Sequence, residues 1–267
     1  MKLSFIGGGT MAEAILKGIL QAGLGNPSDI VVGEIAEARR NYLSDTYGII
    51  TTSDNIKAIQ KADLTVLSIK PQDLGSVSNS LKGQFKKGQS VVSIIAGASL
   101  TTLSQYIEHE EIIRVMPNTP AQIGHGMSVW TSAPAVDRAN IDLTKSILAT
   151  IGEEIYVNDE KYLDMATGLS ASGPAYVFLI IEALIDAGVY VGLPRDMARI
   201  LALQTVYGST KLVMETGNHP AQLKDMVVSP GGTTAEGVQV LEKCGVPAAL
   251  IEAVNSAYLK SIALGKK

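Results

Sequence analysis

The strongest constraint on the fold lies at the very start of the chain. An apolar run, Lys2–Ile6, leads directly into Gly7–Ala12, which reads G-x-G-x-x-A, and apolar residues at helical spacing follow. The first glycine of such a motif allows a tight turn, the second lets the backbone approach a pyrophosphate, and the small last residue lets the helix pack on the sheet. Free N–H groups at the helix N-terminus favour bound phosphate. The segment therefore predicts a dinucleotide site, with a ligand-free glycine-rich turn as the alternative.

The rest of the N-terminal half alternates between short β-branched runs and helical patterns. Such alternation predicts a parallel sheet with helices on both faces, and a further strand pair around a helix near residues 136–151 would give about seven or eight strands. The predicted strands are Lys2–Ile6, Ile30–Glu34, Leu64–Ile69, Ser90–Ile94, Ile112–Val115, Met127–Thr131 and Glu154–Val157.

The pattern changes near Glu160, after which the sequence has no strand-like run. The first helical segment there, Ser172–Val189, is apolar on nearly every side, and only Glu182 and Asp186 interrupt it. A helix of this kind must be buried all round, which a small domain cannot achieve without a partner subunit. The predicted helices are Ser172–Val189, Pro194–Thr216, Pro220–Val227, Thr233–Cys244 and Pro247–Leu264.

Together these patterns predict an α/β fold with two domains. A Rossmann-type doubly wound sheet is expected over residues 1–158, and an all-helical dimerisation domain over residues 159–267. The apolar helix leads us to expect a homodimer or a higher multiple of dimers.

Composition argues against several classes of partner. A net charge of −4 and a pI of about 5.5 give no basic surface for nucleic acid. Mean hydropathy is high, at +0.21, yet the longest strongly apolar stretch, Ala175–Ile181, falls far short of the roughly 20 residues that span a membrane. The single cysteine, Cys244, cannot form an intrachain disulfide, and the three histidines have no metal-like spacing. We expect a cytoplasmic protein without metal, membrane or nucleic-acid partners.

Three loops follow predicted strands at the sheet edge where ligands bind in this architecture. The turn Ser68–Pro71 places Lys70 after an apolar strand, where it either contacts a ligand or is an ordinary surface lysine. Small residues at Ala96 and Gly97 leave room for a flat nicotinamide ribose. Two prolines stiffen Met116–Pro120, which turn chemistry alone explains equally well.

One segment of the helical half also points to a ligand. Ser229–Thr234 reads Ser-Pro-Gly-Gly-Thr-Thr and opens a helix with hydroxyl groups in its first turn. Backbone N–H groups at such a point form a ready carboxylate site. An ordinary helix cap explains one Ser or Thr, but not two glycines and two threonines together.

These motifs resemble those of pyrroline-5-carboxylate reductases over essentially the whole chain and in family order. The resemblance implies reduction of the cyclic imine acid 1-pyrroline-5-carboxylate to L-proline with NADPH or NADH, the final step of proline synthesis. It also implies a Rossmann domain and a helical domain that interlaces in a dimer, with larger rings of dimers in some members. The motifs that carry it are G-x-G-x-x-A, Ser68–Pro71, Met116–Pro120, Ser172–Tyr176 and, most specifically, Ser229–Thr234.

Carried onto this sequence, the family pattern implies a role for each motif. The implied cofactor residues are Gly7, Gly9, Thr10 and Met11 at the phosphates, Asn55 and Ser68 at the adenosine half and ribose, and Lys70, Ala96 and Gly97 at the nicotinamide. The implied substrate residues are Ser229, Gly231, Gly232 and Thr233 at the carboxylate and Thr234 at the ring nitrogen. Thr234 and Lys70 are the catalytic candidates. Because a hydroxyl is a poor acid, we expect Thr234 to position the substrate first and to donate a proton second.

Other dehydrogenase classes fit the sequence less well. Tyr207 and Lys211 match the Y-x-x-x-K of short-chain dehydrogenases, but they lie in the helical half, so we interpret the match as chance. β-Hydroxyacid dehydrogenases place a catalytic lysine on the long interdomain helix, and this chain has no lysine between Lys161 and Lys211. A non-catalytic NAD(P)-binding sensor would need the N-terminal motif but not Ser229–Thr234.

The sequence leaves the choice between NADH and NADPH open. Glu34 ends the second predicted strand, where an acidic residue holds the ribose 2′-hydroxyl of NAD and repels a 2′-phosphate. Arg39 and Arg40 follow closely and could bind a phosphate, or all these side chains could be solvated surface groups. We expect Glu34 to favour NADH unless one of the arginines reverses the preference.

Overall fold

The computed structural model describes residues 2–265 and divides into two compact units. The first comprises Met1–Ser172 together with Ser256–Lys267, and the second comprises Gly173–Asn255. Each unit has its own architecture, and the site residues predicted from the sequence are shared between them.

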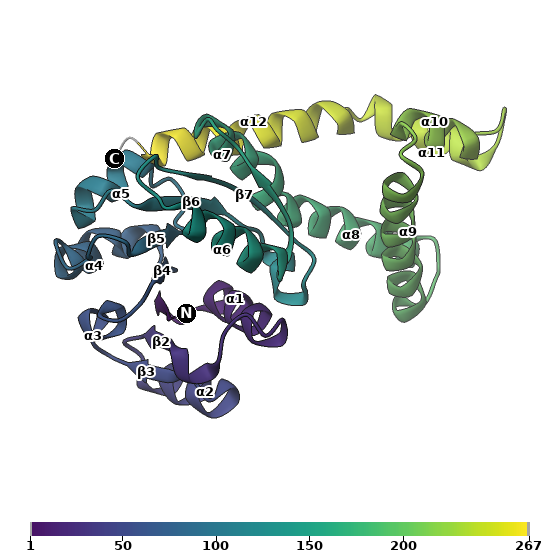
Figure 1. Ribbon diagram of the computed structural model, residues 1–267. Helices are drawn as coiled ribbons and strands as arrows, with labels where there is room; N and C mark the ends of the chain where they lie inside the picture. Colours follow the sequence, from purple (N-terminus) through teal and green to yellow (C-terminus); the bar gives the residue numbers. More distant parts are fainter. Residues whose placement is uncertain (1, 266–267) are drawn as a thin grey trace. The chain divides into compact units, whose positions relative to one another are not determined.

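The first unit is built on an eight-stranded sheet in the order β3-β2-β1-β4-β5-β6-β7-β8 (Figure 1). Strands β1 to β6 run parallel, β7 is antiparallel to β6, and β8 is parallel to β7. The order of β1 to β6 is that of a Rossmann sheet, so the predicted fold class is confirmed. The strands are β1 Leu3–Ile6, β2 Ile30–Gly33, β3 Ile50–Thr52, β4 Leu64–Leu67, β5 Ser90–Ser93, β6 Ile112–Met116, β7 Gly126–Ser132 and β8 Gly152–Tyr156.

Two features of the sheet differ from the sequence prediction. Strand β3 was not predicted, because it is a short edge strand whose side chains are half-buried or exposed and show no alternation. Strand β7 is antiparallel because only residues 117–125 separate it from β6, too few for the helical crossover that parallel strands need.

Helices cover both faces of the sheet and give the unit two apolar cores (Figure 1). Ile15, Leu43 and Leu148 of one helical layer pack with Phe5 and Val115 of the strands. Alternate positions of the same strands pack on the other layer, as expected for a sheet buried on both faces. The first layer contains α1 Thr10–Gln21, α2 Glu37–Tyr47 and α6 Arg138–Ala149, and the second contains α3 Asn55–Ile59, α4 Leu74–Leu81 and α5 Leu100–Ile107.

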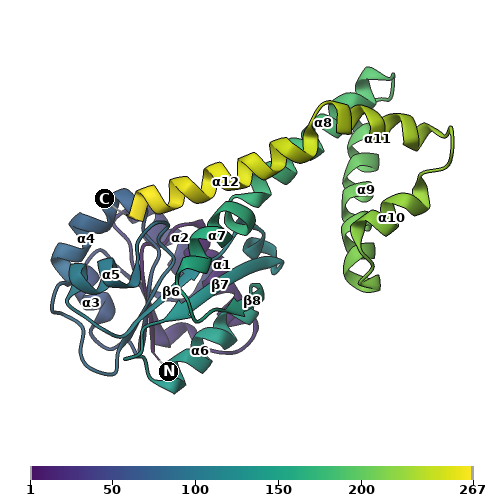
Figure 2. The same cartoon turned by 90° about the horizontal axis from the view of Figure 1, so that it is seen from above.

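The C-terminal end of the chain returns to this first unit (Figure 2). Helix α12, Val246–Gly265, places Ser261 where its hydroxyl donates to Asp164 of α7, Lys161–Ala166, at 2.8 Å. The guanidinium of Arg114, on β6 and only 2% exposed, donates to Asp164 at 3.0 Å and to Glu160 at 2.8 Å. Through these hydrogen bonds and ion pairs, α7 and the end of α12 are both connected to β6 of the sheet.

The contacts divide the chain later than the expected boundary between residues 158 and 159. Helix α7, the π-helical turn Thr167–Ala171 and the last part of α12 all belong to the sheet unit by packing. The difference arises because the Arg114 network draws residues from the predicted helical half onto β6.

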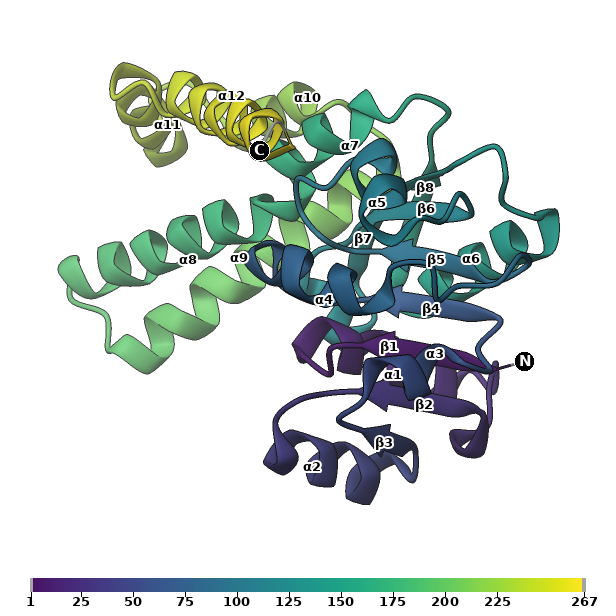
Figure 3. The same ribbon diagram turned by 90° about the vertical axis from the view of Figure 1, so that its left-hand side faces the viewer.

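The second unit is helical throughout Gly173–Asn255. Helices α8 and α9 form an antiparallel hairpin (Figure 3), in which Gly188 allows close approach: a Cβ there would lie 2.8 Å from the Cβ of Ala198. Not one residue of α8 is buried within the single chain. The helices are α8 Gly173–Tyr190, α9 Arg195–Thr216, α10 Pro220–Val227, α11 Thr233–Lys243 and the first part of α12.

The predicted helix Ser172–Val189 does not start as a separate helix at Ser172. The π-helical turn joins it to α7, so one helix runs over Lys161–Tyr190. Among residues 2–265 this is the one helix long and apolar enough to cross a membrane by length and composition alone. The sequence analysis compared only the uninterrupted apolar run Ala175–Ile181 with the length of a membrane span, and so it missed this longer helix. A helix buried between two subunits has the same length and composition, so these properties alone do not distinguish the two environments.

We predict that Gly152→Ala destabilises the protein by about 3 kcal/mol or more. Gly152 has φ +143°, and an added Cβ would lie 2.0 Å from the carbonyl oxygen of Gly126 in the paired strand. The matched control is Gly75→Ala in α4, where no heavy atom lies within 4 Å of the added methyl and a gain of up to about 1 kcal/mol is expected. Urea unfolding measures both; equal stability of the two variants would contradict the prediction.

Candidate functional site

A cavity of about 500 Å³ opens at the carboxyl ends of β1 and β4. Strand order reverses between these two strands, which is where open α/β sheets bind ligands. Many of the predicted cofactor residues meet there, although they come from separate turns. The lining residues are Ile6, Gly7, Gly9, Gly33, Glu34, Ile35, Asn55, Ser68, Ile69, Lys70, Gln72, Asp73, Ser76 and Val77.

The glycine-rich loop has the geometry that the motif predicts. Gly7 has φ +96°, and its N–H donates to the carbonyl oxygen of Gly33 at 2.8 Å. A Cβ at Gly7 would lie 2.8 Å from the carbonyl oxygen of Ser68, so only glycine fits this turn. Gly9 caps α1, and no heavy atom lies within 4 Å of its Cβ position. The loop therefore combines a forced turn with open space at the helix N-terminus.

Polar side chains also line the cavity beside this loop. The Ser68 hydroxyl donates to the carbonyl oxygen of Gly7 at 2.7 Å, which fixes the loop against the end of β4. Asn55 begins α3 and lies over Gly33, where a Cβ would come within 2.6 Å of the Asn55 Oδ1. Lys70 is exposed at the start of the next turn, and its ammonium has no ion pair within residues 2–265. It is free to contact a ligand in the cavity.

Glu34 lines the cavity and also binds the glycine-rich loop. Its Oε2 accepts the Gly8 N–H at 2.9 Å, and its Oε1 accepts the Ala36 N–H at 2.9 Å. The two arginines that follow bind backbone carbonyl oxygens: Arg40 donates to those of Glu34 and Ile35, both at 2.8 Å, and Arg39 donates to that of Gly8 at 2.6 Å. The cavity lining includes the carboxylate and not Arg39 or Arg40.

Several predicted cofactor residues lie outside this lining. Thr10 begins α1 and is exposed, whereas Met11 packs against the apolar core beneath that helix. Ala96 and Gly97 lie after β5, and Gly97 has φ +76°. A Cβ at Gly97 would lie 2.8 Å from the Cβ of Leu264, so close packing of the end of α12 also requires glycine there.

The loop after β6 has a structural role that its sequence did not reveal. The Asn118 side chain accepts the Met127 N–H at 2.8 Å and donates to the Ser170 carbonyl oxygen at 3.0 Å. It thereby ties the start of β7 to the π-helical turn. π-Helical turns are rare in proteins, and those that do occur are often found at functional sites. Neither partner of Asn118 is close to it in sequence, so no local pattern predicted the contact.

In the second unit, Ser229–Thr234 forms a tight turn rather than a side-chain cap. The Gly232 N–H donates to the Ser229 carbonyl oxygen at 2.9 Å, and Gly231 has φ +68°, as a type II turn with proline at its second position requires. A Cβ at Gly232 would lie 2.3 Å from the Ser229 Oγ. Helix α11 begins at Thr233 without a side-chain cap bond. The alternative that Ser229 or Thr233 is an ordinary cap is therefore wrong.

The cavity also has lining residues that the sequence analysis missed. Some of them come from the turn Pro71–Asp73 and the first part of α4, and Ile35 adds an apolar side chain that is 84% exposed. None of these residues belongs to a recognisable motif. Those of α4 lie at the cavity because the chain crosses over from β4 into that helix. The lining residues that were not predicted as site residues are Ile6, Gly33, Ile35, Ile69, Gln72, Asp73, Ser76 and Val77.

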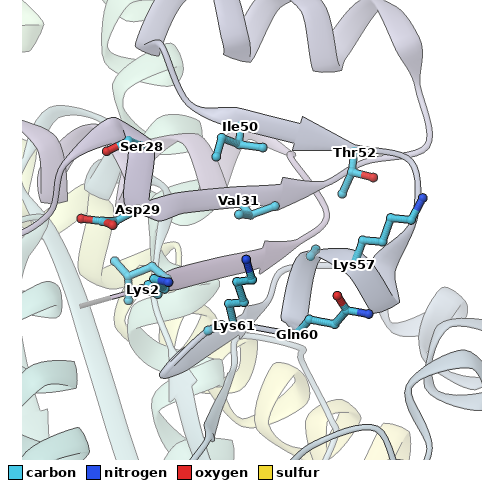
Figure 4. Close-up of a pocket in the computed structure, with 12 residues that line it drawn as sticks. Lys2, Ser28, Asp29, Val31, Ile50, Thr52, Lys57, Gln60 and Lys61 are labelled. Atoms are coloured by element: carbon cyan, nitrogen blue, oxygen red, sulfur yellow. The ribbon is translucent and has the colours of Figure 1, made fainter.

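A second cavity, of about 490 Å³, contains none of the predicted site residues (Figure 4). It lies beside α3 near the amino ends of β1 and β2, and Lys2, Lys57 and Lys61 surround its apolar floor. Ligands bind such sheets at the carboxyl ends, so this is not the dinucleotide site. Within residues 2–265 no His, Cys, Asp and Glu side chains gather as a metal site, and His109 lies buried in the loop between α5 and β6.

A charged cluster supports the glycine-rich loop from behind. Glu13 of α1 accepts hydrogen bonds from Arg39 at 2.5 Å, Tyr47 at 2.7 Å and Tyr42 at 2.9 Å. Burial raises the pKa of the Glu13 carboxyl, but the hydrogen bonds from Arg39 and the two tyrosines outweigh it, so this pKa lies below its ordinary value of 4.5. Burial, together with donation to Glu13, raises the pKa of Tyr47. Glu13 is therefore charged at neutral pH and Tyr47 is not.

We predict that Glu13→Gln lowers the free energy of unfolding by about 1 kcal/mol at pH 7, because a charge-assisted pair is lost. The folded pKa is depressed, so the wild-type advantage is complete above pH 4.5 and disappears as the pH falls through the folded value. Urea unfolding at pH 7 and pH 3 measures this. Asp142→Asn, which removes an exposed ion pair on α6, is the control. A difference between Glu13→Gln and wild type that is the same at both pH values would contradict the prediction.

Two protein families match separate parts of the chain. Residues 2–97 match the family described as NADP oxidoreductase coenzyme F420-dependent, and residues 160–264 match pyrroline-5-carboxylate reductase dimerisation. The first match covers the glycine-rich loop and its cavity, and it confirms the prediction of a nicotinamide dinucleotide cofactor. The second begins close to the expected boundary between residues 158 and 159 and covers the Ser229–Thr234 turn.

Similar proteins match the chain over its whole length. A pyrroline-5-carboxylate reductase of Synechocystis is 47% identical over 100% of this chain and 99% of its own length, and one of Pisum sativum is 43% identical over 97% and 94%. A Plasmodium falciparum pyrroline carboxylate reductase solved with NADP bound superimposes with a TM-score of 0.91 at 34% identity, covering 99% of this chain and 98% of that one. At these identities the chain belongs to the pyrroline-5-carboxylate reductase family.

Proposed function

We propose that this protein reduces 1-pyrroline-5-carboxylate to L-proline with NADPH or NADH, the last step of proline biosynthesis. The observation that carries the proposal is the cavity at the β1–β4 switch point, where the Gly7 turn, Ser68 and Asn55 converge as a dinucleotide site requires. The choice of 1-pyrroline-5-carboxylate as the substrate rests on membership of the family. The Ser229–Thr234 turn supplies a second group of polar residues suited to a carboxylate.

The substrate carboxylate fits the start of α11. The type II turn leaves the first N–H groups of the helix without a side-chain cap, and a helix N-terminus carries partial positive charge. The collision that any side chain at Gly232 would make with Ser229 explains the second glycine of the motif. We assign the substrate carboxylate to Ser229, Gly231, Gly232 and Thr233.

To catalyse this reaction the protein must orient the substrate and cofactor and stabilise the charges that develop, and it does not need a strong acid. When bound, the reduced nicotinamide supplies a hydride to the carbon of the C=N bond and becomes oxidised. An iminium substrate brings its own proton, so the nitrogen of the product needs no donor from histidine or cysteine. We assign Thr234 to hold that nitrogen through its hydroxyl, and Lys70 to the nicotinamide side of the cavity.

The cofactor residues divide by the part of the dinucleotide that they meet. The open space at Gly9, at the N-terminus of α1, suits the pyrophosphate, with Gly7, Thr10 and Met11 around it. Asn55, Ser68 and Glu34 suit the adenosine half and its ribose, and Ala96 and Gly97 the nicotinamide. The net charge of −4 is consistent with a cytoplasmic enzyme that acts without nucleic acid.

The purified protein is expected to form proline from 1-pyrroline-5-carboxylate and a reduced nicotinamide cofactor. Oxidation of NADH and of NADPH is followed at 340 nm in separate assays, with proline measured as product. Because Glu34 would repel a 2′-phosphate that it faces, we expect a higher kcat/KM with NADH than with NADPH. Folded protein that binds a cofactor but forms no proline would instead favour a non-catalytic sensor.

Thr234→Ala is expected to lower kcat by about thirtyfold, which corresponds to about 2 kcal/mol for one lost transition-state hydrogen bond. Dissociation constants for NADH and NADPH should change little, because the cofactor is held mainly by the sheet unit. Thr233→Ala, one residue earlier in the same turn, is the comparison. The melting temperature is measured with both: full kcat with a lowered melting temperature would reject the catalytic role of Thr234.

We propose that the helical unit forms a homodimer, or a multiple of dimers. Helix α8 exposes Phe178 to 60% and Leu179 to 66% within one chain, a larger apolar surface than monomers normally tolerate. The match of residues 160–264 to a dimerisation family supports the same surface. A dimer also gives the apolar helix Lys161–Tyr190 a protein partner, so no membrane is needed to cover it.

Light scattering at micromolar concentration is expected to give a mass of twice the 28.1 kDa chain or a multiple of that value. Leu179→Glu should lower this mass, because a charge would be buried in the interface. A monodisperse wild-type monomer would contradict the dimer.

A further inference from the structure

Gly8, in the middle of the glycine-rich loop, is held from both sides by charged side chains. The Glu34 carboxylate accepts its N–H at 2.9 Å, and the Nε of Arg39 donates to its carbonyl oxygen at 2.6 Å. A loop of consecutive glycines has no side chains of its own with which to fix its backbone, and its conformational entropy is high. These two contacts therefore restrict the peptide groups beside the expected pyrophosphate position.

Arg39 is itself held in this position by two further side chains, those of Glu13 and Tyr42. Its Nη2 forms an ion pair with Glu13 at 2.5 Å, and its guanidinium lies 4.9 Å above the centre of the Tyr42 ring. Tyr42 and Tyr47 donate to the same Glu13 carboxylate, so the acceptor is also held in place. The Arg39 side chain is only 27% exposed. The guanidinium is thus directed at the back of the loop rather than into the cavity.

We propose that Arg39 is a positioning residue for the glycine-rich loop and not a ligand of the 2′-phosphate of NADPH, and that Glu13 holds it in this role. The inference rests on the proposed function, since it concerns the same cofactor site. Arg40 is likewise bound to the carbonyl oxygens of Glu34 and Ile35. Both arginines that the sequence offers as phosphate ligands therefore support the backbone of the cavity.

The two roles of Arg39 predict different effects on the two cofactors. NADH and NADPH share the pyrophosphate and differ only in the 2′-phosphate. A residue that orders the loop contributes equally to both, because preorganisation lowers the cost of binding any ligand of that loop. A ligand of the 2′-phosphate contributes to NADPH alone. Lysine separates the roles further, because it keeps the positive charge but lacks the fork that joins Gly8 to Glu13.

The experiment measures dissociation constants of NADH and NADPH without substrate, by cofactor fluorescence, for wild type, Arg39→Met and Arg39→Lys. We expect both variants to weaken both cofactors by about tenfold, with the ratio of the two constants unchanged within about twofold. Glu13→Gln, which keeps Arg39 but removes its ion pair, should weaken both cofactors less and to the same extent. Arg138→Met removes an arginine that also pairs with a carboxylate but lies exposed on α6, so it should change neither constant.

A loss confined to NADPH in Arg39→Met, recovered in Arg39→Lys, would overturn the proposal and make Arg39 a phosphate ligand. Unchanged constants in both variants would overturn it as well. If Arg39→Met fails to fold, as judged by its melting temperature, Glu13→Gln gives the same comparison of the two cofactors. Wild-type protein that binds neither cofactor would contradict the proposed function itself.

Discussion

The first unit depends on one close approach, that of the Gly7 turn to the end of β4. A side chain at Gly7 would collide with the backbone of Ser68, so β1 and β4 can be neighbours at this edge only with glycine there. The same turn directs the chain into α1 and exposes the helix N-terminus to the cavity. Strand order also reverses between β1 and β4. At such a point the connections from the two strands lead to opposite faces of the sheet, which leaves a crevice for a ligand at the carboxyl ends of the strands. Fold and cofactor site are thus consequences of one steric requirement.

A different constraint governs the second unit, in which apolar surface exceeds what one chain can cover. The sheet unit buries both of its cores, whereas α8 buries no residue within its own chain. The free energy gained by removing such side chains from water scales with the area covered, so association is favoured wherever two copies meet. The two halves of the chain therefore differ in how they cover apolar surface: the sheet unit buries its own cores, whereas the helical unit leaves α8 uncovered, which is the surface that the proposed dimer would bury.

Local patterns in the sequence predicted most of the elements, and tertiary contacts account for what was missed. Gly7–Ala12 and Ser229–Thr234 were recognisable because each requires particular residues at fixed spacing. Strand β3 carried no periodic signal, and the antiparallel direction of β7 depends on the length of its connection rather than on composition. The contacts of Asn118, and the network of Arg114, join residues far apart in the chain. Arg39 belongs to this class: its sequence position is compatible with a phosphate ligand or a surface group, and only the fold brings it to Gly8 and Glu13 behind the loop.

The balance between backbone and side-chain groups determines where this enzyme is vulnerable to mutation. The groups expected to meet phosphate and carboxylate are largely peptide N–H groups at the starts of α1 and α11, which substitution does not remove. Catalysis by orientation requires those groups to be held within a fraction of an ångström, about 0.5 Å. The side chains that hold them, such as Glu34 on Gly8 and Ser68 on Gly7, then matter as much as any group that touches the substrate. Because substitution leaves these peptide N–H groups in place, the supporting side chains are where a mutation can alter this part of the site.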